Sequence, residues 1–351
     1  MSASRSLLVR TRHRRRMLAM VSLPLVLALG LAACGGDDEP EEESSSEPTD
    51  GTSTAGAVTL NGQWPLTGEK LEGSLPEHPV YVVKIDNSSS SAPQVGLDSA
   101  DLIVEELVEG GITRLAVFYY QDLPRDTGPV RSMRATDIGI VKPANATLVA
   151  SGGARMTIGR LDRAGVATVT DGAPGFYRDD SRPVPYNLFM KLPDLAKDPA
   201  KGWKAPSKSY FEFGDESEFS GDITVKKMRA VFSGGHTTEW KYTDKGWIRP
   251  NSNAQKGNDF VADNVLLLEV RVGDAGYLDP AGNPVPETFF SGKGKGVLVH
   301  GDRAQRVTWH KGLKMSQLKL TSQDGKPVPV PVGQTWVELV PAQEGMIALS
   351  K

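Results

Sequence analysis

The chain has 351 residues but only one cysteine, Cys34, and five histidines. A single cysteine excludes an intramolecular disulfide framework and any zinc cluster made of cysteine ligands. No two histidines lie three or four residues apart, so a multi-histidine metal site would need ligands from distant segments. We therefore expect neither a bound metal ion nor a cofactor.

Several catalytic signatures are absent as well. The sequence has no G-x-S-x-G elbow, no Walker loop, no H-E-x-x-H pair and no EF-hand loop. The glycine-rich residues 291–296 lack the G-x-G-x-x-G spacing and lead into an apolar run, where a dinucleotide site needs a helix. We predict a mobile hairpin loop there. No nucleophile is identified, so the sequence favours binding over catalysis and leaves enzyme activity uncertain.

The N-terminus carries the pattern of an export signal. A basic stretch ending at Arg16 precedes a mostly apolar run, residues 17–31, and then Ala32 and Ala33. The run is shorter than the ~20 residues of a bilayer span, which is typical of a signal peptide. Residues 31–34, Leu-Ala-Ala-Cys, resemble the bacterial lipoprotein cleavage box, in which the thiol receives acyl chains such as palmitate. We predict a lipoprotein signal peptide at residues 1–33. A lipidated Cys34 would then hold the protein at the extracytoplasmic face of the bacterial cell membrane.

Charge is distributed unevenly along the chain. The formal net charge is -3, but six of the 40 basic residues lie in residues 1–33, which contain no acid. Without them 34 basic and 43 acidic residues remain, a net charge of -9. So acidic a protein is a poor candidate for binding nucleic acid, where phosphate contacts dominate. Residues 35–60 hold eight acids and no base, so we predict that residues 34–60 form an acidic disordered tether.

The rest of the chain predicts the α+β fold class, with two units. Residues 61–212 are expected to form a mixed-sheet N-terminal unit with helices. Its strands are expected at residues 80–85, 102–108, 113–120 and 147–150, and its helices at 133–141, 155–162 and 187–197. Gly110 and Gly111 separate the second and third strands and favour a hairpin.

Residues 213–351 are expected to form a β-rich, mainly antiparallel C-terminal unit. Short apolar runs there are separated by glycine, proline and aspartate, which predicts strands at residues 228–232, 238–242, 264–272, 296–300, 304–310, 318–321 and 335–340. The pattern does not decide whether the two units share a core.

Two polar segments are candidates for ligand binding. In the first, residues 128–134, a Gly-Pro turn precedes Arg131 and Arg134. If a helix begins at Ser132 or Met133, backbone amides and both guanidinium groups would converge on an anion. In the second, residues 176–188, aromatic residues accompany Arg178, Arg182 and Asn187, as at many sugar-binding sites. For each segment, packing and local ion pairs are the alternative explanation.

Acidic residues offer partners for these arginines. Asp86 and Asn87 follow an apolar strand, a common position for functional side chains, and they complete the set of candidate ligand-binding residues. Glu105 or Glu109 is expected to pair with Arg114 across the hairpin. A pair of carboxylates could alternatively serve acid–base chemistry if burial separated their pKa values.

These motifs resemble the YerB-like family of bacterial lipoproteins. The segments that carry the resemblance are residues 83–87, 92–97, 100–101, 108–114, 128–134, 176–179, 185–188, 292–296, 307–309 and 333–337. The family commonly has histidine where this chain has Tyr186. The resemblance covers residues 65–345 and implies a two-part α+β protein, anchored outside the cytoplasmic membrane, with no established reaction.

Three functions are compatible with the sequence. The first is a membrane-anchored lipoprotein that binds an anionic or glycan envelope ligand, or a cell-wall protein partner, without catalysis. The second is an envelope enzyme that acts on a cell-wall polymer or a lipid-linked phosphate, with the four arginines as charge clamps and Asp86 as acid or base. The third is a solute-binding lipoprotein. A single anion site requires that the two arginine segments lie close together.

Overall fold

The structure is a computed structural model that describes residue 60 and residues 62–351. The predicted signal peptide, Cys34 and all of the predicted tether except residue 60 lie outside the described residues, so these remain predictions. Within the described part, no helix is both long enough and apolar enough to cross a membrane.

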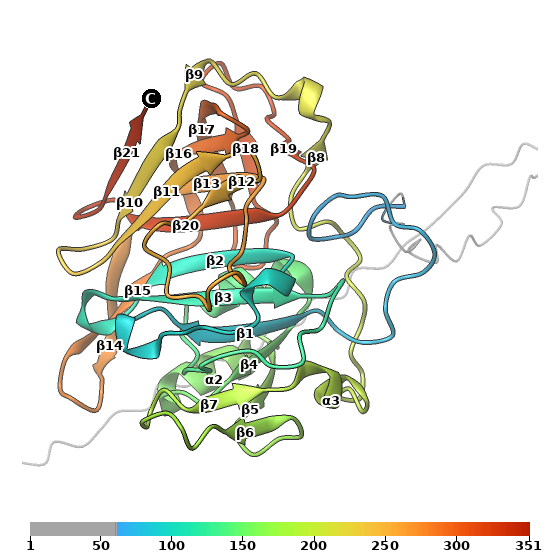
Figure 1. The fold of residues 1–351 in the computed structure, drawn as a ribbon, viewed down its shortest axis with the longest axis vertical. Coiled ribbons are helices and arrows are strands. Elements are labelled where there is room, and N and C mark those ends of the chain that lie inside the picture. Colours follow the sequence, from blue (N-terminus) through green and yellow to red (C-terminus); the bar gives the residue numbers. More distant parts are fainter. Residues whose placement is uncertain (1–59, 61) are drawn as a thin grey trace, which may run out of the picture. The chain divides into compact units, whose positions relative to one another are not determined.

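An 11-stranded mixed sheet runs through the described chain (Figure 1). Its strands are β1 (Tyr81–Asp86), β2 (Leu102–Leu107), β3 (Thr113–Tyr119), β4 (Thr147–Ala150), β5 (Ala167–Thr170), β9 (Ile223–Thr224), β13 (Asn264–Val270), β16 (Gly292–His300), β17 (Arg303–Lys311), β18 (Lys319–Thr321) and β20 (Thr335–Pro341). Their order is β18-β17-β16-β13-β20-β2-β3-β1-β4-β5, and β9 pairs with β17.

Smaller sheets complete the β structure. A four-stranded sheet has the order β12-β11-β10-β21, with the bounds β10 (Lys227–Val231), β11 (Thr237–Thr243), β12 (Gly246–Ile248) and β21 (Met346–Ser350). Three pairs stand alone: β6 (Phe176–Arg178) with β7 (Leu188–Met190), β8 (Phe213–Gly214) with β19 (Val330–Pro331), and β14 (Val272–Leu278) with β15 (Pro284–Thr288).

Among the described residues the α-helices are few and short: α1 (Asp137–Val141), α2 (Arg155–Arg163) and α3 (Leu192–Ala196). Strand β4, helix α2 and strand β5 follow one another, and β4 and β5 pair in parallel. This is a βαβ unit, in which the helix carries the chain back across the sheet.

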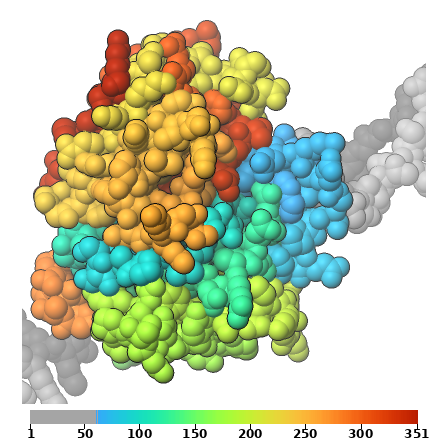
Figure 2. All heavy atoms as spheres, viewed as in Figure 1, coloured from blue at the N-terminus to red at the C-terminus, as the bar shows by residue number. Residues whose placement is uncertain are grey.

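The α+β class is confirmed, and so are the β2–β3 hairpin and all seven strands expected in the C-terminal unit. Strands from both sides of residue 212 share the large sheet, because β20 pairs in parallel with β2 (Figure 1). In the space-filling view the N-terminal strands, in teal, form a band between the green segment below and the yellow and orange segments above (Figure 2). The division of the chain into units 61–212 and 213–351 stays a prediction.

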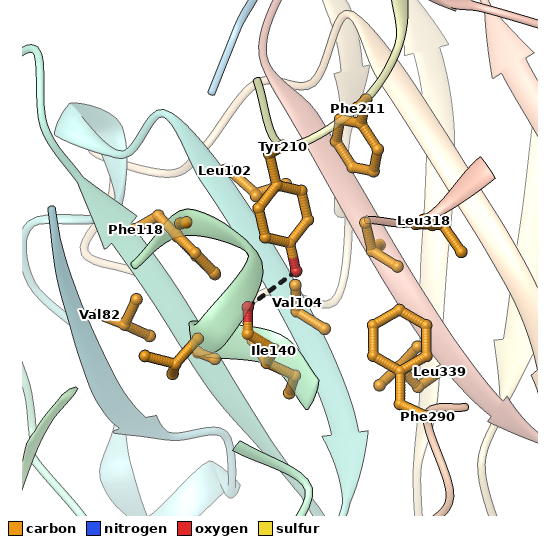
Figure 3. Packing of buried hydrophobic residues seen from close by; sticks show 14 of the residues in the cluster. Val82, Leu102, Val104, Phe118, Ile140, Tyr210, Phe211, Phe290, Leu318 and Leu339 are labelled. Carbon is orange, nitrogen blue, oxygen red and sulfur yellow. Dashed lines mark hydrogen bonds between the residues drawn. The ribbon is translucent and has the colours of Figure 1, made fainter. Parts of the chain in front are cut away.

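Both faces of the sheet are covered, so alternate residues of its strands enter different cores. On one face Val82, Val104 and Phe118 pack with Ile140 of α1 and with Tyr210, whose hydroxyl donates to the Ile140 carbonyl at 3.0 Å (Figure 3). On the other face Val83, Ile103 and their neighbours pack against β10 and β11. The neighbouring residues Glu105 and Glu106 therefore lie in different surroundings.

Two predicted helices are wrong in part. Residues 133–136 are not helical, and α1 begins only at Asp137, because Met133 N donates to Gly152 O and Arg134 N donates to the Asp137 carboxylate. Residues 188–190 form strand β7 rather than helix. Backbone bonds from Val130 N to Leu188 O and between Thr127 and Met190 hold this segment extended, and α3 starts afterwards at Leu192.

The predicted hairpin loop at residues 291–296 is also wrong, because β16 begins at Gly292. A Cβ atom at Gly294 would lie 2.5 Å from Trp309 Nε1. The glycine at this position therefore allows close packing of the Trp309 side chain across the strand pair, rather than a flexible turn.

Asp101 predicts a pH dependence of stability. Burial raises the pKa of its carboxyl from 3.8 to about 7, although the carboxylate accepts bonds from Tyr120 N at 2.6 Å and Gln121 N at 3.2 Å. The folded state thus holds this proton more tightly, so stability is greatest at low pH and falls as the pH rises from about 4 to about 7.

An Asp101→Asn variant keeps the acceptor and cannot ionise. It should lack this slope and be more stable than the parent at pH 8, by up to ~4 kcal/mol, in urea unfolding series at several pH values. Equal slopes in the two proteins would contradict this assignment.

Candidate functional site

An open cleft of about 510 Å³ gathers three arginines from two segments of the chain. Its charged floor is formed by Glu109, Arg114, Arg131 and Arg134. Its remaining walls are Ser132, Ser151, Gly152, Gly153, Ala154, Tyr277, Leu278, Asp279, Pro280 and Val285. We call it the arginine cleft.

Backbone bonds fix the segment that carries Arg131 and Arg134. Arg131 N donates to Lys84 O on β1 at 2.8 Å, and Ser151 N after β4 donates to Arg131 O at 3.0 Å. The segment is thereby held between the ends of two strands of the large sheet. The two side chains are placed by the sheet edge and not by a helix start.

Arg114 is the most deeply buried of the three, with only 2% of its surface exposed. Its Nη1 donates to Ser132 O at 2.9 Å, whereas its Nε is buried and has no hydrogen-bond partner among the described residues. Burial, together with the charge of Arg134, lowers the pKa of Arg114 to about 10. The group therefore stays charged at neutral pH, and one of its donors is unused.

Carboxylates partly neutralise the cleft. Arg134 Nε donates to Glu109 Oε2 at 3.2 Å, and Arg134 Nη2 donates to Glu109 Oε1. Arg114 Nη2 lies 3.5 Å from the same Oε1. Burial alone would raise the pKa of Glu109, but the charges of Arg114 and Arg134 lower it below its ordinary value. Arg131 Nε lies 3.2 Å from Asp86 Oδ2. The expected pairing of Glu109 with Arg114 is confirmed. Three arginines and two acidic residues, Glu109 and Asp279, line the cleft, and Asp86 contacts Arg131 from outside the lining, so the charges nearly balance.

The amino end of α2 opens onto the same cleft. Residues 151–154 lead from β4 into α2, and Gly152 has a φ of 128°, a backbone conformation that favours glycine. Within the described chain no side chain caps the first turn of α2. Free amides of a first helical turn, following a glycine loop after a parallel strand, are a common anion site. Helix α1, from which the sequence argument expected these amides, has only five residues and begins after Arg134.

A buried ion cluster of Lys84, Glu106 and Asp137 contacts the backbone of Arg134. Lys84 is fully buried, and its Nζ lies 2.6 Å from Glu106 and 2.8 Å from Asp137. The other oxygen of Asp137 accepts from Arg134 N at 2.6 Å. Lys84 therefore helps to fix the backbone at Arg134.

The second predicted segment, residues 176–188, contacts Arg131 of the first, but its own Arg182 binds backbone carbonyls outside the arginine cleft. Arg131 Nη1 donates to Pro185 O at 3.2 Å, and its guanidinium stacks on the Tyr186 ring with 5.4 Å to the ring centre. Arg182 donates to Ser91 O at 3.3 Å and to Pro93 O at 2.8 Å. These contacts tie the 176–188 segment to the loop after β1.

Arg178 and Asn187 bind each other and do not line the arginine cleft. Arg178 Nη1 donates to Asn187 Oδ1 at 2.9 Å, and its Nη2 pairs with Asp171. Of the seven candidate ligand-binding residues, the structure thus places Arg131 and Arg134 on the cleft floor, with Asp86 in contact with Arg131.

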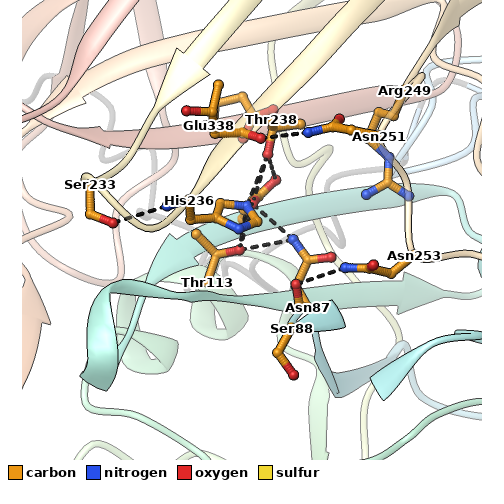
Figure 4. Close-up of polar contacts among 12 residues, drawn as sticks. Asn87, Ser88, Thr113, Ser233, His236, Thr238, Arg249, Asn251, Asn253 and Glu338 are labelled. Carbon is orange, nitrogen blue, oxygen red and sulfur yellow. Dashed lines mark hydrogen bonds and ion pairs between the residues drawn. The ribbon is translucent and has the colours of Figure 1, made fainter. Parts of the chain in front are cut away.

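Asn87 belongs to a buried polar network around Glu105 (Figure 4). The Glu105 carboxylate accepts bonds from Asn87 Nδ2 at 3.0 Å, Thr113 Oγ1 at 2.6 Å and Thr238 Oγ1 at 3.0 Å, and it lies 2.8 Å from His236 Nε2. In Figure 4 the side chains of His236 and Thr238 point toward Thr113 and Asn87. The network joins the β1–β3 region to the β10–β11 hairpin.

Two carboxylates in this network have opposite pKa shifts. Burial alone would raise the pKa of Glu105, but the hydrogen bond and charge of His236 lower it to about 2. Burial and the charge of Glu105 raise the pKa of Glu338 well above its ordinary value. Separated pKa values are typical of acid–base pairs. Both carboxylates are fully buried, however, and only 15% of the His236 side chain is exposed, so the network lies inside the fold.

A larger cavity of about 770 Å³ lies over β16 and β17. Lys295 and Arg306 line it, but Glu269 lies there too and much of the wall is apolar, including Val297 and Leu349. Both basic side chains are exposed to water. Exposed charges of this kind bind anions weakly, so the arginine cleft is the stronger candidate.

Three features of these sites were not predicted from the sequence. Gly152 and Gly153, between an expected strand and an expected helix, were a usable signal for the α2 site. Arg114 was interpreted only as a partner for glutamate. His236 gave no sequence signal, because its partners come from segments far away along the chain.

The fold and the cleft define an α+β protein in which a βαβ unit and a mainly antiparallel region share one sheet, with an arginine-lined cleft beside the βαβ unit. The chain belongs to the family described as "Protein of unknown function (DUF3048)", whose N-terminal domain matches residues 66–204 and whose C-terminal domain matches residues 228–337. The resemblance to the YerB-like family is thereby confirmed.

Two comparisons with individual proteins agree with this assignment. The chain is 25% identical over 293 residues to "Putative lipoprotein YerB" of Bacillus subtilis (strain 168), covering 79% of this chain and 86% of that protein. The crystal structure of the YerB protein from Bacillus subtilis superposes with a TM-score of 0.67 at 23% identity, covering 82% of this chain and 99% of that chain. The structural likeness shows that the two share a fold.

Proposed function

We propose that this protein is a lipid-anchored envelope protein whose arginine cleft binds an anionic group, such as a phosphate, on an envelope ligand without reacting with it. The observation that carries the proposal is the gathering of Arg114, Arg131 and Arg134 in one open cleft. A hydrogen bond to a charged group contributes about 1.5–3 kcal/mol, so an anion that contacts several of these guanidinium groups would gain affinity.

The geometry suits an anion with several acceptor oxygens. Arginine presents a planar fork that matches phosphate or carboxylate, and three such forks share this cleft with the first turn of α2. Glu109 now contacts two of the three guanidinium groups. An incoming anion therefore either joins Glu109 or replaces it.

The proposed lipid anchor is supported by the lipoprotein box at Cys34 and by the name of the Bacillus subtilis relative, which calls that protein a putative lipoprotein. A tether of about 26 residues would let the cleft reach ~30 Å from the membrane surface if it behaves as a flexible coil. That distance suits a ligand of the cell envelope.

Replacing both Arg131 and Arg134 with lysine should weaken anion binding while the net charge stays the same. Lysine cannot form the two-point contact of a guanidinium, so each lost fork should cost about tenfold or more in affinity. Calorimetric titration of the full-length protein in a nonionic detergent, with pyrophosphate as the probe, measures the loss.

A Glu109→Gln variant is the matched control for this titration. It removes the competing carboxylate but keeps an acceptor for Arg134, so it should bind pyrophosphate more tightly than the parent. Normal binding by the double lysine variant, together with a lowered melting temperature, would show that these arginines act only in the structure.

A further inference from the structure

The arginine cleft has an apolar wall as well as a charged floor. Leu278, at the end of β14, lines the cleft, yet 62% of its surface is exposed. Pro280 and Val285 continue this wall, and the Asp279 carboxylate, which lies between Leu278 and Pro280 in the sequence, accepts from Ala281 N and Asn283 N within its own turn. The hydroxyl groups of Tyr277 and Thr157 lie 2.8 Å apart, which ties the wall to the first turns of α2.

One exposed large apolar side chain lines this cleft, and two others lie on segments next to it. The described part of the chain exposes six large hydrophobic residues: Met156, Val184, Leu278, Leu313, Met315 and Met346. Besides Leu278, Met156 is the second residue of α2, and Val184 precedes Pro185, whose carbonyl accepts from Arg131. Scattered exposed apolar residues are ordinary, so the inference depends on Leu278, which lines the charged cleft itself.

We propose that the ligand of the arginine cleft is an amphipathic phosphate, in which a hydrocarbon chain is attached to the phosphate group. The phosphate contacts Arg131, Arg134 and the amino end of α2, and the first part of the chain lies along Leu278 and Pro280. This inference rests on the proposed anion-binding function. A phosphate without a chain would leave the wall at Leu278 in water, whereas each methylene buried there adds about fourfold to the affinity.

Two water-soluble probes with the same headgroup test the inference. Methyl phosphate and hexyl phosphate are titrated into the full-length protein in a nonionic detergent. If three or more methylenes are buried, hexyl phosphate should bind at least ~50-fold more tightly than methyl phosphate. Hexyltrimethylammonium, with the same chain and the opposite charge, should not bind.

Two single variants test whether the hydrocarbon chain of the ligand lies along Leu278. Leu278→Ser should weaken hexyl phosphate binding by about tenfold and leave methyl phosphate binding unchanged. Leu313→Ser is the control, because Leu313 is 68% exposed and does not line the cleft, so both affinities should stay as in the parent. The double lysine variant at Arg131 and Arg134 should weaken both probes.

The outcomes separate this inference from the function it rests on. Equal affinities for the two phosphates would overturn the amphipathic ligand and leave anion binding intact. Binding of neither phosphate would defeat both proposals. Equal binding of hexyltrimethylammonium, or an equal effect of Leu278→Ser on both phosphates, would also overturn the inference.

A third assay distinguishes the two sources of such a ligand. Because the lipid anchor binds any vesicle, the readout is the extra recruitment that phosphatidylglycerol adds to phosphatidylcholine vesicles. Extra recruitment that is lost in the double lysine variant would identify a bilayer headgroup. Tight hexyl phosphate binding without such recruitment would identify a separate lipid-linked phosphate. Either result supports the amphipathic ligand.

Discussion

Replacing Lys84 with methionine should lower the free energy of unfolding by about 3–5 kcal/mol at pH 7. Lys84 is fully buried between Glu106 and Asp137, at 2.6 Å and 2.8 Å. Burial already raises the pKa of Glu106 in spite of the charge of Lys84. Without the ammonium group two buried carboxyl groups would face each other, and at least one would have to take up a proton.

A variant that removes all three charges is the control for this prediction. In Lys84→Met with Glu106→Gln and Asp137→Asn, the asparagine oxygen can still accept from Arg134 N and no buried charge remains. This triple variant should recover much of the lost stability, because a buried ion cluster contributes little net stability when it is replaced as a whole. Urea unfolding measures all three proteins. A loss below ~1 kcal/mol in the single variant would show that the cluster tolerates an unpaired carboxylate.

The single Lys84→Met variant should also weaken pyrophosphate binding at the arginine cleft. Asp137 bridges Lys84 and the backbone of Arg134, so its reorientation would move the Arg134 side chain. Binding measured on the folded fraction separates this positioning effect from lost stability. Unchanged affinity would restrict Lys84 to a structural role.

The strands were predictable because their signals are local. Apolar runs ended by glycine or proline marked β1 to β4 and the strands of the C-terminal unit, and Gly110 and Gly111 marked the hairpin. Failures occurred where a tertiary contact overrides local preference. Residues 188–190 have a helical pattern but are extended, since Val130 and Thr127 supply strand partners.

The site was predictable only in part. A turn that fixes the backbone before two arginines pointed correctly to Arg131 and Arg134 as neighbours. Whether an arginine meets a carboxylate, a carbonyl or an open cleft depends on which segments the sheet brings together. β2 and β20 are distant in sequence yet adjacent in the sheet, so the surroundings of Glu105 could not be read from its own segment.

Adjacent glutamates illustrate the same limit. Glu105 and Glu106 lie on opposite faces of β2, because side chains alternate along a strand. Glu106 meets Lys84 and Asp137, whereas Glu105 meets His236 and lies opposite Glu338 on β20. Alternation predicts two different surroundings, but only the tertiary structure supplies the partners.

The variants Glu105→Gln and Glu338→Gln should change the free energy of unfolding in opposite directions at pH 8. Glu105→Gln should cost about 3–5 kcal/mol, since one amide oxygen replaces a carboxylate that now serves donors from Asn87, Thr113 and Thr238 as well as His236. Glu338→Gln keeps an acceptor for Trp240 Nε1, now at 2.7 Å, and removes a group that resists ionisation. It should therefore stabilise the protein.

The pH profiles give the sharper test. The pKa of Glu105 is lowered to about 2, so its contribution is present above about pH 4.5 and disappears as the pH falls from there toward 2. The difference between the parent and Glu105→Gln should shrink over that range. The pKa of Glu338 is raised, so the parent loses stability as the pH rises above about 4.5, and Glu338→Gln should lose none from this source. Unfolding curves for the parent and both variants between pH 3 and 9 measure these slopes. If both variants were destabilised equally at every pH, the two carboxyl groups would have the same charge state in the folded protein, and the opposite assignments made for them would be wrong.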